Sequence, residues 1–191
     1  RLSLVGSEMC IRDSFKPKQR RTAAKRLAKV RNERMAEIEQ RRTSAEQTRE
    51  LLRPQAWKRA EAELTRNGLV IVQAYYGRRD AFPTLVDIDL SRIKDKKEIL
   101  PLIQRKGEYN NTNVNQPLWW DVQVPLQMLV TQSQLIIPAG RSKSKLIGFF
   151  DPCVGERKQL LIRYVFQGAL HELVVDDEDA VAAPLRSQQL M

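Results

Sequence analysis

Residues 67–77 read NGLVIVQAYYG, and this stretch decides the fold. Its interior is β-branched and aromatic, and Gly68 and Gly77 bound it, which is the pattern of a β-strand. The preceding Arg66-Asn67-Gly68 is typical of a left-handed helix cap, so a helix is expected to end here. The chain therefore changes at this point from a helical segment to a β-rich domain.

The segment before this change, residues 15–66, favours a long helix. From Lys18 onward it is rich in Ala, Arg, Lys, Glu and Gln, which are good helix formers, and it contains no glycine. Pro54 lacks a backbone donor, so a break or kink is expected near Arg53. One thin apolar stripe permits a coiled coil without requiring one. The stripe consists of Leu27, Val30, Ile38, Ala45 and Leu52.

Residues 1–14 are set aside from the fold prediction. The chain opens with Arg1, which indicates a fragment, and residues 4–14 resemble a translated sequencing adaptor. Such a stretch is excluded in the same way as an expression tag. The alternative interpretation is a genuine amphipathic start. Under the first interpretation Cys10 has no structural meaning, and Cys153 alone supplies neither a disulfide framework nor a metal-binding spacing.

Residues 67–180 are expected to form a β-rich domain, and residues 181–191 a C-terminal tail. Residues 94–115 are polar and indicate a long loop or a short helix followed by a loop, and Gln167-Gly168 is typical of a tight hairpin turn. After the first strand, further strands are predicted at 85–90, at 119–130 with an interruption at Pro125, and at 135–137, 160–166 and 170–175. The predicted fold class is α+β, a long basic N-terminal helix followed by an antiparallel β-sandwich or partly open barrel.

Positive charge is concentrated in the helical segment. Residues 15–66 hold 16 Lys/Arg and 7 Asp/Glu, whereas residues 67–191 hold 15 and 14. Such a field attracts RNA, DNA, anionic lipid or an acidic protein surface. Trp57 is the only aromatic residue from Lys18 to Arg66, which disfavours base stacking, and alanine dominates the apolar positions, which disfavours membrane insertion. A solvated spacer or a partner-binding helix is the plainer interpretation, and a basic nucleic-acid-binding protein is the alternative function.

Catalytic chemistry finds little support in the residue pattern. His171 is the only histidine and has no evident nucleophile partner, while Cys153 reads as a small packed side chain. Asp87 and Asp89 share one strand face, where a solvated pair is the plainer interpretation. No nucleotide-binding loop is present, so no catalytic residue, metal, cofactor or small-molecule substrate is expected. Residues 140–145 form a basic loop in which Arg141, Lys143 and Lys145 are weak candidates for binding an anion or a partner.

Five blocks occur in the order expected for one known family. They are NGLVIVQAYYG (67–77), DVQVPLQMLV (121–130), SQLI (133–136), GFFDPCVGE (148–156) and YVFQGALH (164–171). Together with the charged helix, they resemble the C-terminal domain of the DnaJ homolog subfamily C member 11 family. The resemblance covers most of residues 20–185, although residues 78–117 are longer than this family leads one to expect.

The resemblance implies a non-enzymatic, co-chaperone-like protein. Full-length members carry a J domain whose His-Pro-Asp tripeptide stimulates a heat-shock ATPase. That tripeptide is absent here, because Glu172 follows His171, so no role in ATPase stimulation is carried over. The family implies a mitochondrial, membrane-associated location. Its implied partners are the mitochondrial contact-site and cristae-organising complex and the outer-membrane assembly machinery, with peripheral contact to anionic membrane as a further expectation.

Overall fold

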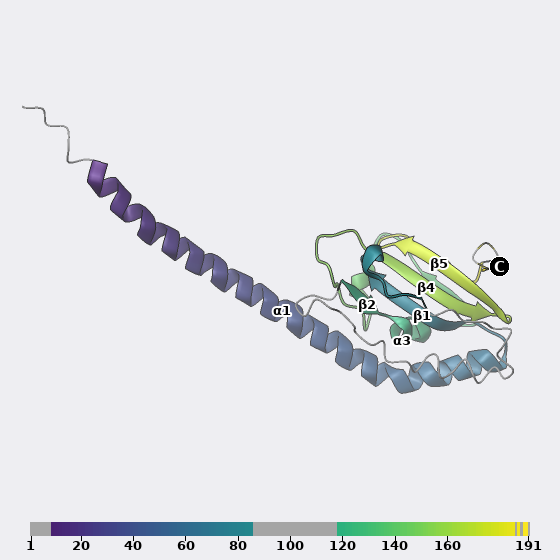
Figure 1. Cartoon of the computed structure of the whole chain (residues 1–191). Coiled ribbons are helices and arrows are strands. Elements are labelled where there is room, and N and C mark those ends of the chain that lie inside the picture. The colour runs from purple at the N-terminus through teal and green to yellow at the C-terminus, as the bar shows by residue number, and fades with distance from the viewer. Residues whose placement is uncertain (1–8, 86–117, 186, 188, 191) are drawn as a thin grey trace, which may run out of the picture. The chain divides into compact units, whose positions relative to one another are not determined.

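The computed structural model describes residues 9–85, 118–185, 187, 189 and 190, with side chains from Arg21 onward within the first helix. The chain divides into two compact units, Arg1–Thr43 and Ser44–Met191. The second unit contains the sheets together with the last part of the long helix (Figure 1). The boundary between the units therefore lies inside the helix, not at its end.

The helical segment is one uninterrupted helix, α1 (Met9–Thr65), which begins inside the adaptor-like stretch. Its end is the predicted left-handed cap: Asn67 has φ 57°, and the Gly68 amide donates to the Glu63 carbonyl at 2.8 Å. Pro54 lies within α1, so the helix does not break there, and a kink at that residue stays a prediction. No described helix has the length and apolar character needed to cross a membrane.

The main sheet has four strands in the order β2-β1-β4-β5, and each neighbouring pair is antiparallel. The predicted first strand is confirmed as β1 (Val70–Gly77), and the predicted hairpin as β4 (Gln159–Phe166) and β5 (Ala169–Asp176). Gln167 and Gly168 both have positive φ, at 51° and 79°, which matches the twist of a two-residue hairpin turn.

The prediction of a strand over residues 119–130 is wrong for most of that range. Only β2 (Trp119–Asp121) is extended, and a short helix, α3 (Gln123–Leu129), follows it. Pro125 is the third residue of α3. The first turn of a helix has no intrahelical partner for its amides, so proline is accommodated there although it would interrupt a strand.

Two glutamines of α3 cover the edge of β1 that β2 leaves open. The amide of Ile71 donates to Gln127 Oε1 at 2.8 Å, and Gln123 Nε2 donates to the carbonyls of Ile71 and Val72 at 3.0 and 2.9 Å. Both glutamines are buried. Side-chain amides thus take the place of a neighbouring strand, which satisfies backbone groups that would otherwise be unpaired.

A second, two-stranded sheet joins the centre of the domain to its C-terminal end. The predicted strand at 135–137 is confirmed as β3 (Leu135–Ile137), and it pairs antiparallel with β6 (Val181–Ala183). The segment predicted as a C-terminal tail, residues 181–191, therefore begins with a strand. Two short 3-10 helices complete the described elements, η1 (Arg79–Ala81) and η4 (Lys143–Lys145).

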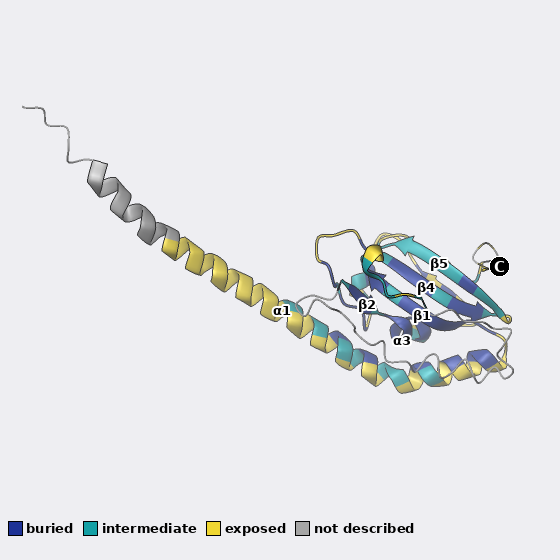
Figure 2. Cartoon of the chain, viewed as in Figure 1, coloured by how far each residue is buried: buried dark blue, intermediate teal, exposed yellow. Residues whose placement is uncertain are grey.

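The last part of α1 packs against the main sheet. Ala60 and Leu64 form a buried apolar cluster with Val70, Val72 and Val165, against which Trp57 and Leu170 are partly buried. Figure 2 shows buried residues along this part of α1 and exposed residues along the earlier part. Polar contacts support the packing, since Arg59 Nη1 donates to the Met128 carbonyl at 2.6 Å.

The predicted α+β class is confirmed: a long helix precedes antiparallel sheets, and no closed barrel is present among the described residues. The predicted strand at 85–90 reaches the described part only at Leu85, which has no regular structure. Residues 86–90, with Asp87 and Asp89, and the predicted loop at 94–115 lie outside the described residues.

Candidate functional site

The basic loop at 140–145 does not present Lys143 to solvent. The Lys143 side chain is only 1% exposed, and its Nζ donates to the carbonyl oxygens of Asp176, Asp177 and Asp179 at 2.7, 2.6 and 2.8 Å. Burial lowers the pKa of Lys143, and the acidic residues 176–179 oppose that shift. Lys143 therefore links the 140–145 loop to the end of β5 through hydrogen bonds, and its ammonium group is not available to an anion.

Asp177 connects this loop to the centre of the sheet. Its Oδ1 accepts hydrogen bonds from the Tyr76 hydroxyl at 2.7 Å and from the Lys143 amide at 2.9 Å. Burial, and then the hydrogen bond to Asp177, raise the pKa of Tyr76. Hydrogen bonds among Asp177, Tyr76 and Lys143 thus connect three segments of the domain. Arg141 and Lys145 remain exposed, and an anion-binding role for them stays a prediction.

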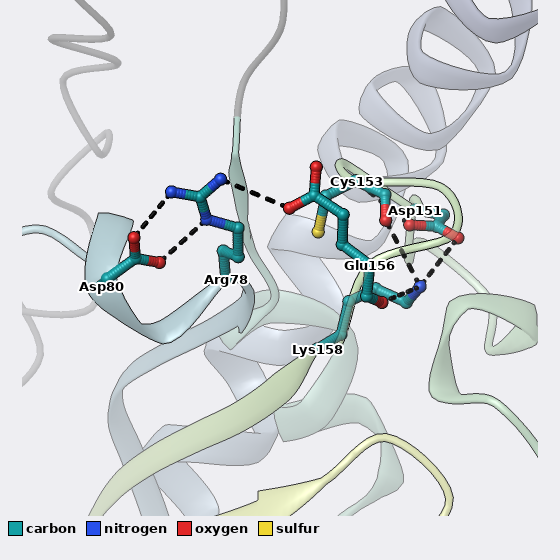
Figure 3. Close-up of polar contacts among 6 residues, drawn as sticks. All are labelled: Arg78, Asp80, Asp151, Cys153, Glu156 and Lys158. Atoms are coloured by element: carbon teal, nitrogen blue, oxygen red, sulfur yellow. Dashed lines mark hydrogen bonds and ion pairs between the residues drawn. The ribbon is translucent and has the colours of Figure 1, made fainter.

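A second polar cluster lies where β1 ends and the 151–156 turn begins (Figure 3). Arg78 makes a bidentate contact with Asp80, at 2.9 and 2.6 Å, and reaches Glu156 at 3.3 Å. Lys158 Nζ lies 3.3 Å from the Asp151 carboxylate and donates to the Glu156 carbonyl at 3.1 Å. These contacts close the turn and neutralise its charges, which is a structural arrangement and not a reactive one.

Cys153 lies inside this turn and is buried, as the sequence predicts for a small packed side chain. Its amide donates to Asp151 Oδ1 at 3.1 Å, in a local turn that positions the residue. Burial raises the pKa of the thiol to about 11. Since the thiolate is the nucleophilic form, Cys153 is held in its unreactive state at neutral pH.

His171 is also buried, on β5, rather than at the surface. Its ring stacks on Tyr164 with centroids 4.9 Å apart and planes at 8°, and its Nδ1 lies 3.1 Å from the Ala169 carbonyl oxygen. A cavity of about 520 Å³ adjoins the ring. The described residues that line it are Phe166, Gln167, Ala169, His171, Pro184, Leu185 and Gln189, and His171 is the one ionisable side chain among these.

Residues 9–85 and the described residues from 118 onward contain no candidate metal-binding site. No group of three or more His, Cys, Asp or Glu side chains in these ranges is placed to hold a metal ion. The titratable side chains that the sequence singles out, Lys143, Cys153 and His171, lie in separate contacts and form no common centre.

The exposed part of α1 is the strongest candidate for an interaction surface. Residues 21–43 are exposed throughout, except for Ile38 and Arg42, which are half-buried. Ion pairs within the helix join Lys29 to Glu33, Glu37 to Arg41 and Glu39 to Arg42. The sequence predicts this helix and its charge, but the thin apolar stripe does not indicate which part of it is free.

Comparison with known proteins identifies relatives over most of the chain. The family model described as DnaJ-like protein C11, C-terminal, matches residues 29–184. The chain is 35% identical over 176 residues to DnaJ homolog subfamily C member 11 of Mus musculus, covering 92% of this chain and 26% of that protein. A Dictyostelium discoideum homolog is 34% identical over 125 residues, covering 65% of this chain and 18% of that protein.

The relatives extend to a fungal protein and are all much longer than this chain. An uncharacterized J domain-containing protein of Schizosaccharomyces pombe is 32% identical over 110 residues, covering 53% of this chain and 18% of that protein. The chain spans about a quarter of the length of the mammalian relatives that it matches. No solved structure matches it.

Proposed function

This chain belongs to the family of DnaJ-like protein C11 C-terminal domains, and from that premise we propose that it is a protein-binding module and not an enzyme. The observation that carries the proposal is how the reactive side chains are used. Lys143 is hydrogen-bonded to three carbonyls, Cys153 is a buried thiol, and the His171 ring is stacked on Tyr164. Each stabilises the fold, and none is paired for catalysis.

The proposal extends to the cellular role that the resemblance implies. We place the module in a co-chaperone-like protein that acts in mitochondrial membrane and cristae organisation. Its expected partners there are the contact-site and cristae-organising complex and the outer-membrane assembly machinery. What supports a binding role is the division of the chain, in which a compact unit, Ser44–Met191, continues into an exposed helical segment.

Capture from detergent-solubilised mitochondria tests this proposal. The chain is immobilised, and bound subunits of the cristae-organising complex are detected with antibodies. The matched control is Ala60→Glu, which changes one fully buried residue and is expected to unfold the second unit while leaving the remaining sequence intact.

We expect the native chain to retain the complex and the Ala60→Glu chain to lose it. Equal retention by both chains would show that binding does not use the folded module. No retention by the native chain would remove the partner assignment. Turnover of any substrate by the native chain that is lost in a Cys153→Ala or His171→Phe variant would overturn the non-enzymatic assignment.

A further inference from the structure

We propose that residues 21–34 of α1 dock peripherally on an anionic lipid bilayer. The inference rests on the charge, exposure and spacing of this segment and not on the proposed function. It concerns a helix that lies on the membrane surface, since no described helix could span one. We call residues 21–34 the cationic segment.

Most of the cationic segment lies in a stretch that contains no acidic residue. Residues 16–32 hold eight Lys/Arg and no Asp/Glu. Of the five that fall within the described side chains, Lys29 alone has an acidic partner there, Glu33 at 3.8 Å. The other four are exposed and make no ion pair with a described residue; they are Arg21, Lys25, Arg26 and Arg31.

The next part of the same helix is electrostatically different. Residues 33–50 hold four Lys/Arg and five Asp/Glu, and most of these form pairs three or four residues apart. A paired helix face attracts an anionic surface weakly, because its own carboxylates oppose the attraction. The unneutralised positive field of α1 is therefore confined to its first half.

Apolar side chains lie within the cationic segment and are unusually open to water. Leu27 is 72% exposed and Val30 is 61% exposed. With about 3.6 residues per turn, Ala23, Leu27 and Val30 form a short strip on one face. Arg26 and Arg31 flank that strip on its two sides, from which long side chains reach headgroups while their stems lie along apolar surface.

This combination favours a bilayer over a nucleic acid. A bilayer surface offers phosphates to the arginines and an acyl boundary to Leu27 and Val30, whereas a nucleic-acid backbone offers only the phosphates. Single-stranded binding also uses aromatic side chains, and residues 18–56 contain none. Each basic residue near an anionic leaflet strengthens binding by roughly five-fold, so several together give a measurable affinity.

Vesicle co-sedimentation of the full chain tests the inference. The probes are vesicles of phosphatidylcholine alone and vesicles of phosphatidylcholine mixed with phosphatidylserine. We expect binding to the mixed vesicles only, and a steep loss as salt shortens the screening length from about 10 Å at 0.1 M to about 3 Å at 1 M. Circular dichroism checks that every variant keeps its helix.

Two variants and two matched controls locate the surface. Lys25→Gln/Arg26→Gln/Arg31→Gln is expected to weaken binding about 100-fold, and Leu27→Gln/Val30→Gln about 10-fold or more. The charge control, Lys58→Gln/Arg79→Gln/Arg157→Gln, removes three exposed cations elsewhere and is expected to change binding less than about three-fold. The apolar control is Leu51→Gln, which alters a residue of α1 that is 77% exposed outside the cationic segment.

Three outcomes would overturn the inference. The first is that the native chain ignores the mixed vesicles. The second is that the charge control loses as much binding as the Lys25→Gln/Arg26→Gln/Arg31→Gln variant, which would assign the effect to net charge. The third is that a single-stranded RNA competes the chain off vesicles at physiological salt while Leu27→Gln/Val30→Gln leaves RNA binding intact, which would assign the surface to nucleic acid.

Discussion

Residues 21–43 and residues 44–65 belong to one helix, yet they are in different physical situations. In the first part alanines such as Ala24 and Ala28 are exposed, whereas in the second part Ala45, Ala56 and Ala60 are buried against the β-rich unit. Both parts consist mainly of good helix formers, although the first carries more positive charge. The comparison teaches that a sheet within reach, and not helix-forming tendency, decides which part becomes core.

Long side chains also differ in use between the two parts. In the first, Arg41 bonds to Glu37 along the helix surface at 2.7 Å. In the second, Arg49 lies over the Trp120 ring, 5.0 Å from its centroid, and Glu63 accepts a hydrogen bond from Ser133 at 2.5 Å. Local pairs of the first kind add only a few tenths of a kcal/mol each, so the first part gains little stability from its side-chain contacts.

Amide hydrogen exchange is expected to give the largest contrast. Amides of residues 44–65 are expected to exchange through global unfolding, and those of residues 21–43 through local fraying of an unsupported helix. A protection difference of about a thousand-fold or more should follow for a unit of ordinary stability. Mass-spectrometric exchange measures it, and equal protection would show that the exposed part has a stabilising contact of its own.

A matched pair of alanine substitutions should show the next largest effect. Ala60→Glu places a carboxylate without a partner in the cluster with Leu64 and Val165, and it should cost about 4 kcal/mol or more, enough to remove most of the stability of a marginally stable unit. Ala28→Glu is expected to change stability by less than about 0.5 kcal/mol, because Ala28 is exposed. Urea unfolding measures both, and similar midpoints for the two variants would contradict the docking of α1.

The two lysines of η4 allow a buried and an exposed side chain to be compared within the β-rich unit. Lys143→Met removes the donor for three carbonyl oxygens and should cost about 3 kcal/mol. Lys145→Met serves as the control, with an expected change below about 0.5 kcal/mol, because Lys145 is exposed. Thermal unfolding distinguishes them, and a neutral Lys143→Met would mean that water readily replaces the ammonium.

Glutamine substitutions should have a smaller effect. Gln127→Met keeps the side-chain volume but leaves the Ile71 amide without its acceptor, at an expected cost of about 2 kcal/mol. Gln40→Met, on the exposed part of α1, is the matched control and should be neutral. Chemical denaturation provides the measurement; an unchanged Gln127→Met would show that α3 is not needed to cover the β1 edge.

The reactivity of the Cys153 thiol measures its burial without any substitution in the chain. Because the pKa of Cys153 is raised from 9.0 to about 11, its thiolate fraction at pH 8 is about a hundred-fold lower than in the unfolded chain. Alkylation at Cys153, followed by mass spectrometry, should therefore be slow in the native chain and fast in denaturant. Its rate should rise as pH approaches 11, and equal native and denatured rates at pH 8 would contradict the buried placement.

Most of the fold can be predicted from local sequence signals. The cap at 66–68, the strand β1 and the β4–β5 hairpin follow from residue types that act on their immediate neighbours. The misassigned region is 119–130, a largely apolar stretch that fits either a strand or a short helix. What makes α3 helical is the backbone edge of β1, more than 50 positions away, to which Gln123 and Gln127 bond.

The site residues divide in a similar way. The sequence correctly predicts that Cys153 is packed, because a lone cysteine in a Pro-Cys turn has no chemistry to join. It does not predict that Lys143 is buried, since the carbonyls that receive Lys143 lie 33 to 36 positions along the chain. No local pattern signals such a contact, because carbonyl oxygens are present at every residue.

The sequence by itself determined a long helix, an antiparallel β-rich domain after Gly68, and a positive charge concentrated upstream of it. These are properties of composition, spacing and turn chemistry, which act over a few residues. The tertiary structure alone decided that α1 is docked only from about Ser44 onward and that β6 pairs with β3. It also decided that Lys143 is buried and donates hydrogen bonds to backbone carbonyls at the end of β5 and just after it. Burial and long-range pairing depend on which distant surfaces meet, so they are settled only when the chain folds.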